Sequence, residues 1–213
     1  MKVHRFIFSP IDENTYVLID KSGDCAIVDC GCYDDAENEE LASYITENKL
    51  HPVLLLNTHC HLDHVFGNKF ILENYNLRTL CHEKEEMNLK SSIGHAALFG
   101  LSMEMPPEPE RFVEDNEVIK FGSTELKALH VPGHAGGSLA FYNEKEGCVF
   151  TGDALFAGSI GRTDLPGGDY ETLMNSIREK LFSLPESTVV YAGHGDETTI
   201  GKEIRTNPWF NMT

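Results

Sequence analysis

The chain has 213 residues, 41% of them hydrophobic, and its 34 acidic and 17 basic residues give a formal charge of −17. This length suits one compact domain over residues 1–213, with no further helical domain after it. The acidic excess argues against nucleic acid as a partner, and no apolar run reaches the ~20 residues of a membrane span. The N-terminus alternates like a strand rather than a signal peptide, so we expect a cytoplasmic protein with reduced cysteines.

The first half of the chain mixes strands with helices. Alternating apolar residues and turn residues indicate an early hairpin, and a short apolar run further on indicates a buried strand. Strands are predicted at residues 1–8, 14–19, 25–29, 53–56 and 78–81. Helices are predicted at residues 34–47, 65–75 and 82–101. Residues 103–109 contain three prolines and are predicted to form an irregular loop that could cover a pocket.

The second half begins with a series of strands joined mainly by hairpin turns. Strands are predicted at residues 111–113, 118–121, 124–131, 138–142, 148–151 and 188–191. Helices are predicted at residues 170–184 and 198–205, and residues 154–169 show no regular pattern. Mixed strands with helices on the outside predict a sandwich of two sheets between helical layers.

The densest group of possible metal ligands directly follows the buried strand at residues 53–56. It reads Thr58-His59-Cys60-His61-Leu62-Asp63-His64. Imidazole nitrogens and carboxylate oxygens suit zinc, iron or manganese. Because four ligands within six residues are many for one ion, the spacing predicts two adjacent ions. A polar loop with surface histidines is the alternative, and further ligands at other strand ends would decide against it.

Such residues do occur at three later strand ends. His134 lies in a glycine-rich turn, Asp153 ends a strand, and His194 lies between two glycines after the last strand. Asp29 also ends a buried strand, and it is either a ligand or a brace for the loop at residues 58–64. We favour the brace. By strand alternation, Cys60 points away from its ligand neighbours.

These motifs resemble the metallo-β-lactamase superfamily along almost the whole chain. The matching stretches are Thr-His-x-His-x-Asp-His at residues 58–64, Gly-His at 133–134, Gly-Asp at 152–153 and Gly-His at 193–194. Asp29-x-Gly31 resembles a structural motif of the family, which with Thr58 supports the ligand loop. The resemblance implies an αββα sandwich. It also implies one metal held by His59, His61 and His134, a second held by Asp63, His64 and His194, and Asp153 bridging them.

Residues 152–156 and 159–168 resemble the short bacterial form of the glyoxalase II branch. That branch implies hydrolysis of a small thioester of the S-lactoylglutathione type by a hydroxide shared between two ions, which we expect to be zinc, with iron or manganese as alternatives. Asp63 and Asp153 would orient this nucleophile. Arg162 and Lys202 are candidates for binding a carboxylate of the thiol carrier. The long enzymes have Lys-Phe-Tyr where this chain has residues 162–164, which leaves the carrier open.

Other functions remain open at this point. Persulfide dioxygenases share the run at residues 161–164 and use one iron, held by the counterparts of His59, His134 and Asp153. A lactamase and a non-catalytic metal-binding module are further alternatives. His82 and His95 have no ligand neighbours in the sequence, and we expect surface or core roles for both.

Overall fold

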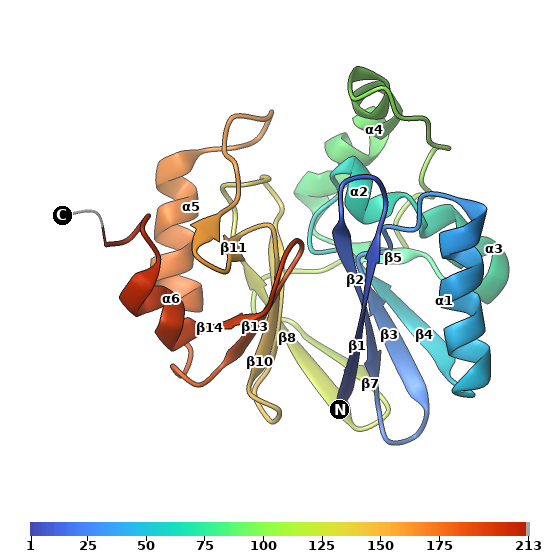
Figure 1. Ribbon diagram of the computed structural model, residues 1–213, viewed down its shortest axis with the longest axis horizontal. Helices are drawn as coiled ribbons and strands as arrows, with labels where there is room; N and C mark the ends of the chain where they lie inside the picture. Colours follow the sequence, from blue (N-terminus) through green and yellow to red (C-terminus); the bar gives the residue numbers. More distant parts are fainter. Residues whose placement is uncertain (212–213) are drawn as a thin grey trace.

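The computed structural model describes residues 1–211, which form two six-stranded sheets packed face to face between helices (Figure 1). The first sheet has the order β1-β2-β3-β4-β5-β6 and the second the order β14-β13-β10-β9-β8-β7. Strands β11 and β12 form a separate hairpin. Both large sheets contain parallel and antiparallel pairs. The expected αββα sandwich is therefore confirmed.

The first sheet and its helices come from the first half of the chain. Its strands are β1 (Lys2–Phe8), β2 (Glu13–Ile19), β3 (Asp24–Val28), β4 (His51–Leu56), β5 (Thr79–Cys81) and β6 (Arg111–Phe112). The accompanying helices are α1 (Asp35–Glu47), α2 (Leu62–Val65), α3 (Asn68–Tyr75), the short 3₁₀ helix η1 (Glu83–Glu85) and α4 (Glu86–Leu98). The Asp34 carboxylate caps α1 by accepting hydrogen bonds from the backbone N–H groups of Ala36 and Glu37, both at 3.0 Å.

The helix predicted at residues 65–75 is wrong in its continuity, because α2 and α3 are separate helices. The break lies at Gly67, whose N–H donates to the carbonyl oxygen of Cys30 at 2.8 Å. A side chain at Gly67 would collide with the Cys30 thiol, so glycine permits this close approach. The break leaves α2 as a single turn that carries two of the ligand candidates, Asp63 and His64.

The second sheet comes from the second half of the chain. Its strands are β7 (Val118–Phe121), β8 (Thr124–His130), β9 (Leu139–Asn143), β10 (Cys148–Gly152), β13 (Val189–Ala192) and β14 (Thr198–Thr199). The hairpin strands are β11 (Leu155–Phe156) and β12 (Ser159–Ile160), so the prediction of no regular structure over residues 154–169 is wrong there. The helices are α5 (Tyr170–Ser176), which continues into a π-helical turn, η2 (Ile177–Leu181), and α6 (Ile200–Thr206).

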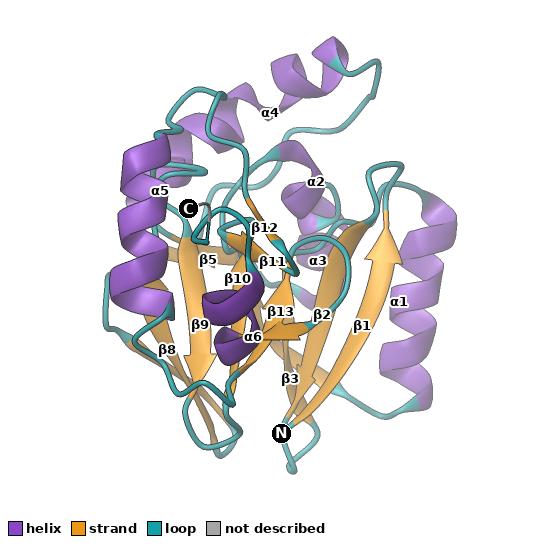
Figure 2. Cartoon of the chain, turned by 60° about the vertical axis from the view of Figure 1, so that its left-hand side comes forward, coloured by secondary structure: helices purple, strands orange, loops and turns teal. Residues whose placement is uncertain are grey.

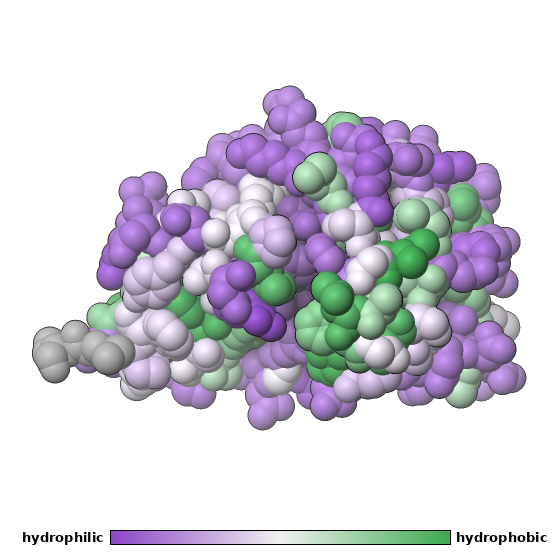
Figure 3. Space-filling model, turned by 90° about the horizontal axis from the view of Figure 1, so that it is seen from above, coloured by the Kyte–Doolittle hydropathy of each residue, from purple (hydrophilic) through white to green (hydrophobic). Residues whose placement is uncertain are grey.

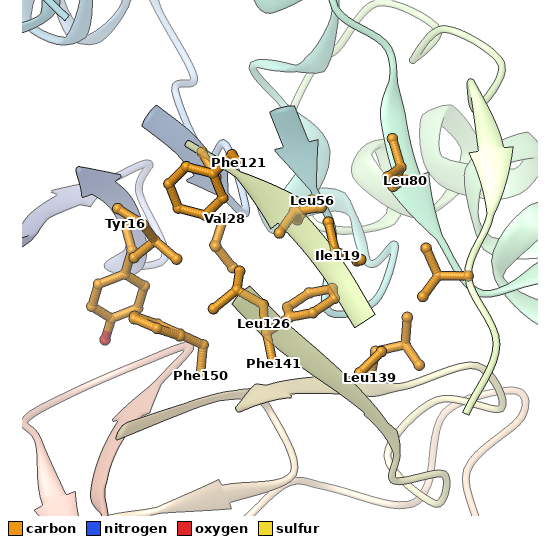
Figure 4. Close-up of a cluster of buried hydrophobic side chains, with 14 of the residues drawn as sticks. Tyr16, Val28, Leu56, Leu80, Ile119, Phe121, Leu126, Leu139, Phe141 and Phe150 are labelled. Carbon is orange, nitrogen blue, oxygen red and sulfur yellow. The ribbon is translucent and has the colours of Figure 1, made fainter. Parts of the chain in front are cut away.

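The main core lies between the two sheets. Figure 4 shows Tyr16, Val28 and Leu56 of the first sheet facing aromatic and aliphatic side chains of the second. Two smaller cores lie on the outer faces: α1 packs on the first sheet through Leu41 and Ile45, and α5 packs on the second (Figure 2). The main core fixes the two sheets relative to each other, and the outer cores fix the helices on the sheets.

Parallel pairing places several strand ends at one edge of the sandwich. Strands β3, β4 and β5 run parallel in the first sheet, and β10 and β13 run parallel in the second. Their carboxyl ends therefore meet at the end of the molecule where α2 and α4 lie in Figure 1. The loops that follow β4, β8, β10 and β13 carry the ligand candidates. Among residues 1–211, no helix combines the length and apolar content needed to cross a bilayer.

Candidate metal centre

The loop after β4 is held by the carboxylate of Asp29. This side chain accepts hydrogen bonds from the backbone N–H of Thr58 at 2.8 Å and from its hydroxyl at 2.6 Å. Asn57 adds a bond from its side-chain amide to the carbonyl oxygen of His64 at 2.7 Å. All of these groups are buried. The loop is thereby fixed at both ends before any ligand binds.

The first group of ligand atoms comes from His59, His61 and His134. Nε2 of His134 lies 3.2 Å from Nε2 of His59 and 2.9 Å from Nδ1 of His61. Ligand atoms at one tetrahedral zinc ion are about 3.3 Å apart, given Zn–N bonds of about 2.0–2.1 Å. The three nitrogens therefore have the separation of ligands around one ion, and His134 brings a loop of the second sheet to a loop of the first.

The second group comes from Asp63, His64 and His194. Oδ2 of Asp63 lies 3.1 Å from Nε2 of His194 and 3.7 Å from Nε2 of His64. Asp153 lies between the two groups: its Oδ1 is 3.4 Å from His64, and its Oδ2 is 3.6 Å from Nε2 of His134 and 3.7 Å from Nε2 of His194. One carboxylate thus faces ligands of both groups, which is the position of a bridge.

The outer nitrogens of the histidines fix which nitrogen faces the centre. Nδ1 of His134 lies 2.8 Å from the carbonyl oxygen of Arg162, and Nδ1 of His194 lies 3.0 Å from that of Asp12. A carbonyl oxygen only accepts, so each Nδ1 carries the proton and each Nε2 presents a lone pair. Nδ1 of His64 lies 3.1 Å from the carboxylate of Asp29, within ion-pair distance. Backbone carbonyl oxygens therefore orient His134 and His194.

The chemistry of these atoms fits metal cations. His64 Nε2 and Asp153 Oδ1 are buried and have no hydrogen-bond partner among the described residues. Burial, together with neighbouring imidazoles, lowers the pKa of His59 well below its ordinary value and lowers the pKa of His61 to about 3. Both imidazoles are therefore neutral at pH 7, as metal ligands must be. Clustered lone pairs beside unsatisfied carboxylate oxygens are stabilised by a cation.

The carboxylates give the centre a negative potential. Burial lowers the pKa of His64, but Asp63, Asp153 and Asp29 outweigh it and raise that pKa well above its ordinary value. Burial raises the pKa of Asp153, yet the nearby His64 and other histidines leave that pKa lowered overall. Positive charge is thus favoured at the second group of ligands. A divalent cation carries twice the charge of a proton and therefore balances these carboxylates better.

Two glycines allow the ligand loops to approach. Gly193 packs so closely against the carboxylate of Asp153 and the ring of His64 that a side chain there would overlap both. Gly133 has φ of +128° and lies against the backbone of Leu173 at the start of α5. Substitution at either position would displace a neighbouring ligand, His194 or His134.

A cavity of about 590 Å³ opens above the ligand cluster. Arg162 lines it, but the guanidinium forms a two-fold hydrogen bond with Asp164, with both N–O distances 2.7 Å. Lys202 lies exposed on α6, outside the set of residues lining this cavity. His95, for which we expected a surface or core role, lines the cavity at the end of α4. Residues 103–109, all described, do not line it; Met103 packs on the buried cluster around Cys60.

Three buried or apolar features of the site escaped the sequence analysis. The buried Glu85 accepts hydrogen bonds from the N–H groups of Cys60 at 2.8 Å and Gly137 at 2.7 Å, and so joins the two loops of the first ligand group. Glu13 lies buried 3.9 Å from His64, and burial raises its pKa well above the ordinary value. Leu98 and Phe99 form an apolar wall of the cavity. None of these roles is indicated by a regular spacing of apolar and polar residues in the sequence.

The fold and this ligand set define a class of protein. A sequence model described as the metallo-beta-lactamase superfamily matches residues 10–194. The chain therefore belongs to the metallo-β-lactamase superfamily.

Among curated relatives, the chain is similar to the probable metallo-hydrolase YqgX of Bacillus subtilis, with 37% identity over 99% of this chain and 98% of that protein. It is equally similar to the hydroxyacylglutathione hydrolase GloC of Haemophilus influenzae, with 37% identity over 99% of each chain. Similar solved structures include BLEG-1 B3 metallo-beta-lactamase, with a TM-score of 0.91, 33% identity, and 99% and 100% coverage of the two chains. TTHA1623 in a di-iron-bound form has a TM-score of 0.88, 36% identity, and 97% and 99% coverage.

Proposed function

We propose that this protein is a dinuclear-metal hydrolase that cleaves small thioesters, as a member of the glyoxalase II-like branch. The observation that carries the proposal is Asp153, whose two oxygens face two separate groups of ligands. The similarity to a relative named as a hydroxyacylglutathione hydrolase over 99% of each chain supports the reaction class.

In this proposal, His59, His61 and His134 would hold one ion and Asp63, His64 and His194 would hold the other, with Asp153 shared. Bound cations would lower the pKa of a water molecule and stabilise negative charge on a carbonyl oxygen. Asp63 and Asp153 would accept hydrogen bonds from the attacking water and so orient it toward the substrate. The hydrogen bonds on the outer side of His134 and His194 keep both rings in the required tautomer.

The cavity also supports a thioester as the substrate. Its described lining contains no serine, threonine, cysteine or lysine, so it offers no side chain for covalent catalysis by those groups. A thiolate leaving group has a conjugate acid with a pKa of about 8.5 and departs without protonation. Water attack on a thioester therefore needs no general acid, whereas release of an amine or alkoxide would.

We also propose zinc as the metal, with iron or manganese as alternatives, and the cytoplasm as the location. Histidine and carboxylate ligands without thiolate suit all three metals, and a similar structure is di-iron-bound. The six cysteines are free and buried in the structure. This suits a reducing compartment. The expected partner is the small substrate, without nucleic acid or membrane.

The test uses protein purified with added zinc and assayed with S-lactoylglutathione and other thioesters under strict anaerobiosis. We expect two equivalents of metal per chain by elemental analysis, and hydrolysis that is unchanged by removing oxygen. His194→Ala should lower activity strongly because it removes a ligand of the second group. Iron-dependent oxygen uptake with a persulfide, insensitive to His194→Ala, would instead identify a mononuclear dioxygenase.

A further inference from the structure

The walls of the cavity differ sharply from its floor. The floor consists of ligand candidates, among them His61, Asp63 and Asp153. The walls are apolar and converge from four separate segments: Ile11 in the β1–β2 turn, Leu98 and Phe99 at the end of α4, Phe156 of β11, and Leu165 and Pro166 before α5. Figure 3 looks onto this end of the molecule and shows hydrophobic residues on both sides of a hollow.

Several of these wall residues are unusually exposed. Leu98 is 82% exposed, Phe99 55% and Ile11 37%. Large apolar side chains that face solvent together around one opening mark a binding surface more often than isolated ones do. Since this surface is continuous with the ligand cluster, a molecule that reaches the floor also contacts the walls. Its apolar part would cover Leu98 and Phe99.

The charges at the opening do not match an anionic carrier. Arg162 is the one lysine or arginine among the described residues lining the cavity, and Asp164 already neutralises it through two hydrogen bonds of 2.7 Å. The whole chain has a formal charge of −17. Among the described lining residues, no unpaired lysine or arginine is available to bind the free carboxylates of glutathione. Apolar contact is therefore the main recognition that the walls offer.

Resting on the proposed thioester hydrolysis, we propose that the cavity binds the acyl arm of its substrate, and that the preferred substrates are thioesters with an apolar acyl chain of medium length on an uncharged thiol. The acyl chain lies between Leu98 and Phe99 on one side and Leu165 and Pro166 on the other. Water adds to the carbonyl carbon, the C–S bond breaks, and the products are a carboxylic acid and a thiol. No oxidant or second substrate is required.

Four substrates test this: the acetyl and hexanoyl thioesters of N-acetylcysteamine, which is uncharged, and of glutathione. Each buried methylene group is worth about 0.8 kcal/mol, or roughly four-fold. Hexanoyl has four more methylene groups than acetyl, so with incomplete burial we expect kcat/KM to rise roughly 30- to 200-fold on either thiol. For the same acyl group, the N-acetylcysteamine thioester should be hydrolysed at least as efficiently as the glutathione thioester.

Variants connect this preference to the wall. In a double variant carrying Leu98→Ser and Phe99→Ser, the ratio of hexanoyl to acetyl kcat/KM should fall below about 5. The matched control is Met87→Ser on the same helix, where Met87 is 79% exposed and lies outside the cavity lining. That control should keep the full ratio. Both side chains of the double variant are exposed, so folding should be little affected, and circular dichroism checks this.

A binding measurement separates this inference from the proposed function. Calorimetry with the hexyl thioether of N-acetylcysteamine, which cannot be hydrolysed, should show binding with a negative heat-capacity change that the double variant loses. If no thioester is hydrolysed by the zinc-loaded protein, the proposed function fails. If thioesters are hydrolysed with no acyl-length preference, with a preference unaffected by the double variant, or with S-lactoylglutathione clearly best, the apolar subsite is wrong and the hydrolase stands.

Discussion

Asp153 differs from the other ligand candidates because its carboxylate faces both groups, at 3.4 Å from His64 and 3.6 Å from His134. Asp153→Ala should therefore disturb both ions and the orientation of the attacking water. We expect a loss of activity of at least ~100-fold and fewer than two equivalents of metal by elemental analysis.

The control for this change is Cys60→Ala. Cys60 lies between two ligand candidates in the sequence, but its side chain is buried with Val65, Cys81 and Leu89, away from the cavity. Its loss should leave the metal content unchanged and reduce activity only modestly. If Cys60→Ala lowers activity more than Asp153→Ala does, the side chains of this loop that point toward the metal centre have been misassigned.

Glu85 acts on the centre without being a ligand. Glu85→Gln keeps one oxygen but turns an N–H₂ group toward a backbone N–H of Cys60 or Gly137, which leaves a buried donor unpaired. This costs about 1–3 kcal/mol. At roughly 2–4 °C per kcal/mol for a chain of this size, the melting temperature should fall by about 2–12 °C. Because the two loops carry the first ligand group, metal content should fall as well.

Glu203→Gln is a matched control. Glu203 is also fully buried and accepts from the N–H of Gly158 at 2.9 Å and the hydroxyl of Thr198 at 2.6 Å, away from the ligand loops. We expect a comparable loss of melting temperature with unchanged metal content. Equal loss of metal in both variants would mean that Glu85 contributes only general stability.

The sequence indicates the ligands and one of their supports, Asp29, but not the supports supplied by Glu85 and by backbone carbonyl oxygens, for a physical reason. His59 to His64 stand together in one loop after an apolar run, and glycines flank His194, so local sequence marks them. Glu85 acts on groups 25 and 52 residues away, through backbone N–H groups that any residue could provide. The orientation of His134 and His194 depends on backbone carbonyl oxygens in the same way. Such contacts leave no local pattern.

Among the elements, periodicity predicted the central strands and α1 well, because each buries a regular apolar face. It failed where tertiary contact interrupts the period. Gly67 splits the predicted helix at residues 65–75 because the Cys30 thiol occupies the space of a side chain. The hairpin of β11 and β12 has two residues in each strand, too few for an alternation to be visible. Leu98 lies on the same helix as the buried Leu89 and Ala96. The sequence pattern of α4 therefore does not distinguish a residue of the cavity wall from a residue of the core.

The turns that join the two sheets at the end opposite the metal centre give a pH-dependent prediction. Asp20, after β2, accepts hydrogen bonds from the N–H of Ser22 at 3.0 Å and from the hydroxyls of Ser123 and Thr124 at 2.8 Å, in the β7–β8 turn. The bond from Ser22, followed by those from Ser123 and Thr124, lowers the pKa of Asp20 below its ordinary value. The stabilisation is therefore present above the unfolded pKa of about 3.9 and is lost as pH falls through the lower folded value.

Asp20→Asn should thus melt below the wild-type protein by an amount that is constant from pH 8 to about pH 5 and shrinks below about pH 4. Melting is followed by circular dichroism with a chelator present throughout, so that metal loss in acid does not contribute. Asp164→Asn is the comparison: Arg162 lowers the pKa of Asp164 to about 2, but the pair is exposed, and we expect almost no change in melting. If the difference in melting temperature between Asp20→Asn and the wild-type protein is the same at every pH, the ionised Asp20 carboxylate is not the source of the stabilisation.

At the scale of the whole molecule, the metal centre is a junction between the two sheets. Four ligand candidates follow β4 of the first sheet, and His134, Asp153 and His194 follow strands of the second. The buried carboxylates of Asp29 and Asp63 and the partly buried carboxylate of Asp153 surround His64 there, with the buried carboxyl group of Glu13 beside them. The apolar core between the sheets is continuous below this edge, but the edge itself is held by polar groups that carry excess negative charge.

Metal removal should therefore lower the stability of the whole sandwich and loosen its edge first. An ion present at about 1,000 times its dissociation constant contributes about 4 kcal/mol, which corresponds to roughly 8–16 °C in melting temperature. Chelator-treated protein should melt at least ~8 °C below the zinc-loaded protein in calorimetry. Hydrogen exchange should speed up at residues 57–65, 133–137, 153–154 and 193–196, while the turn around Asp20 stays protected. The melting temperature of the Asp153→Ala protein should fall less on chelation, because this variant binds less metal at the start. Equal melting temperatures with and without chelator, in protein shown to have lost its metal, would mean that the ions serve catalysis without joining the sheets.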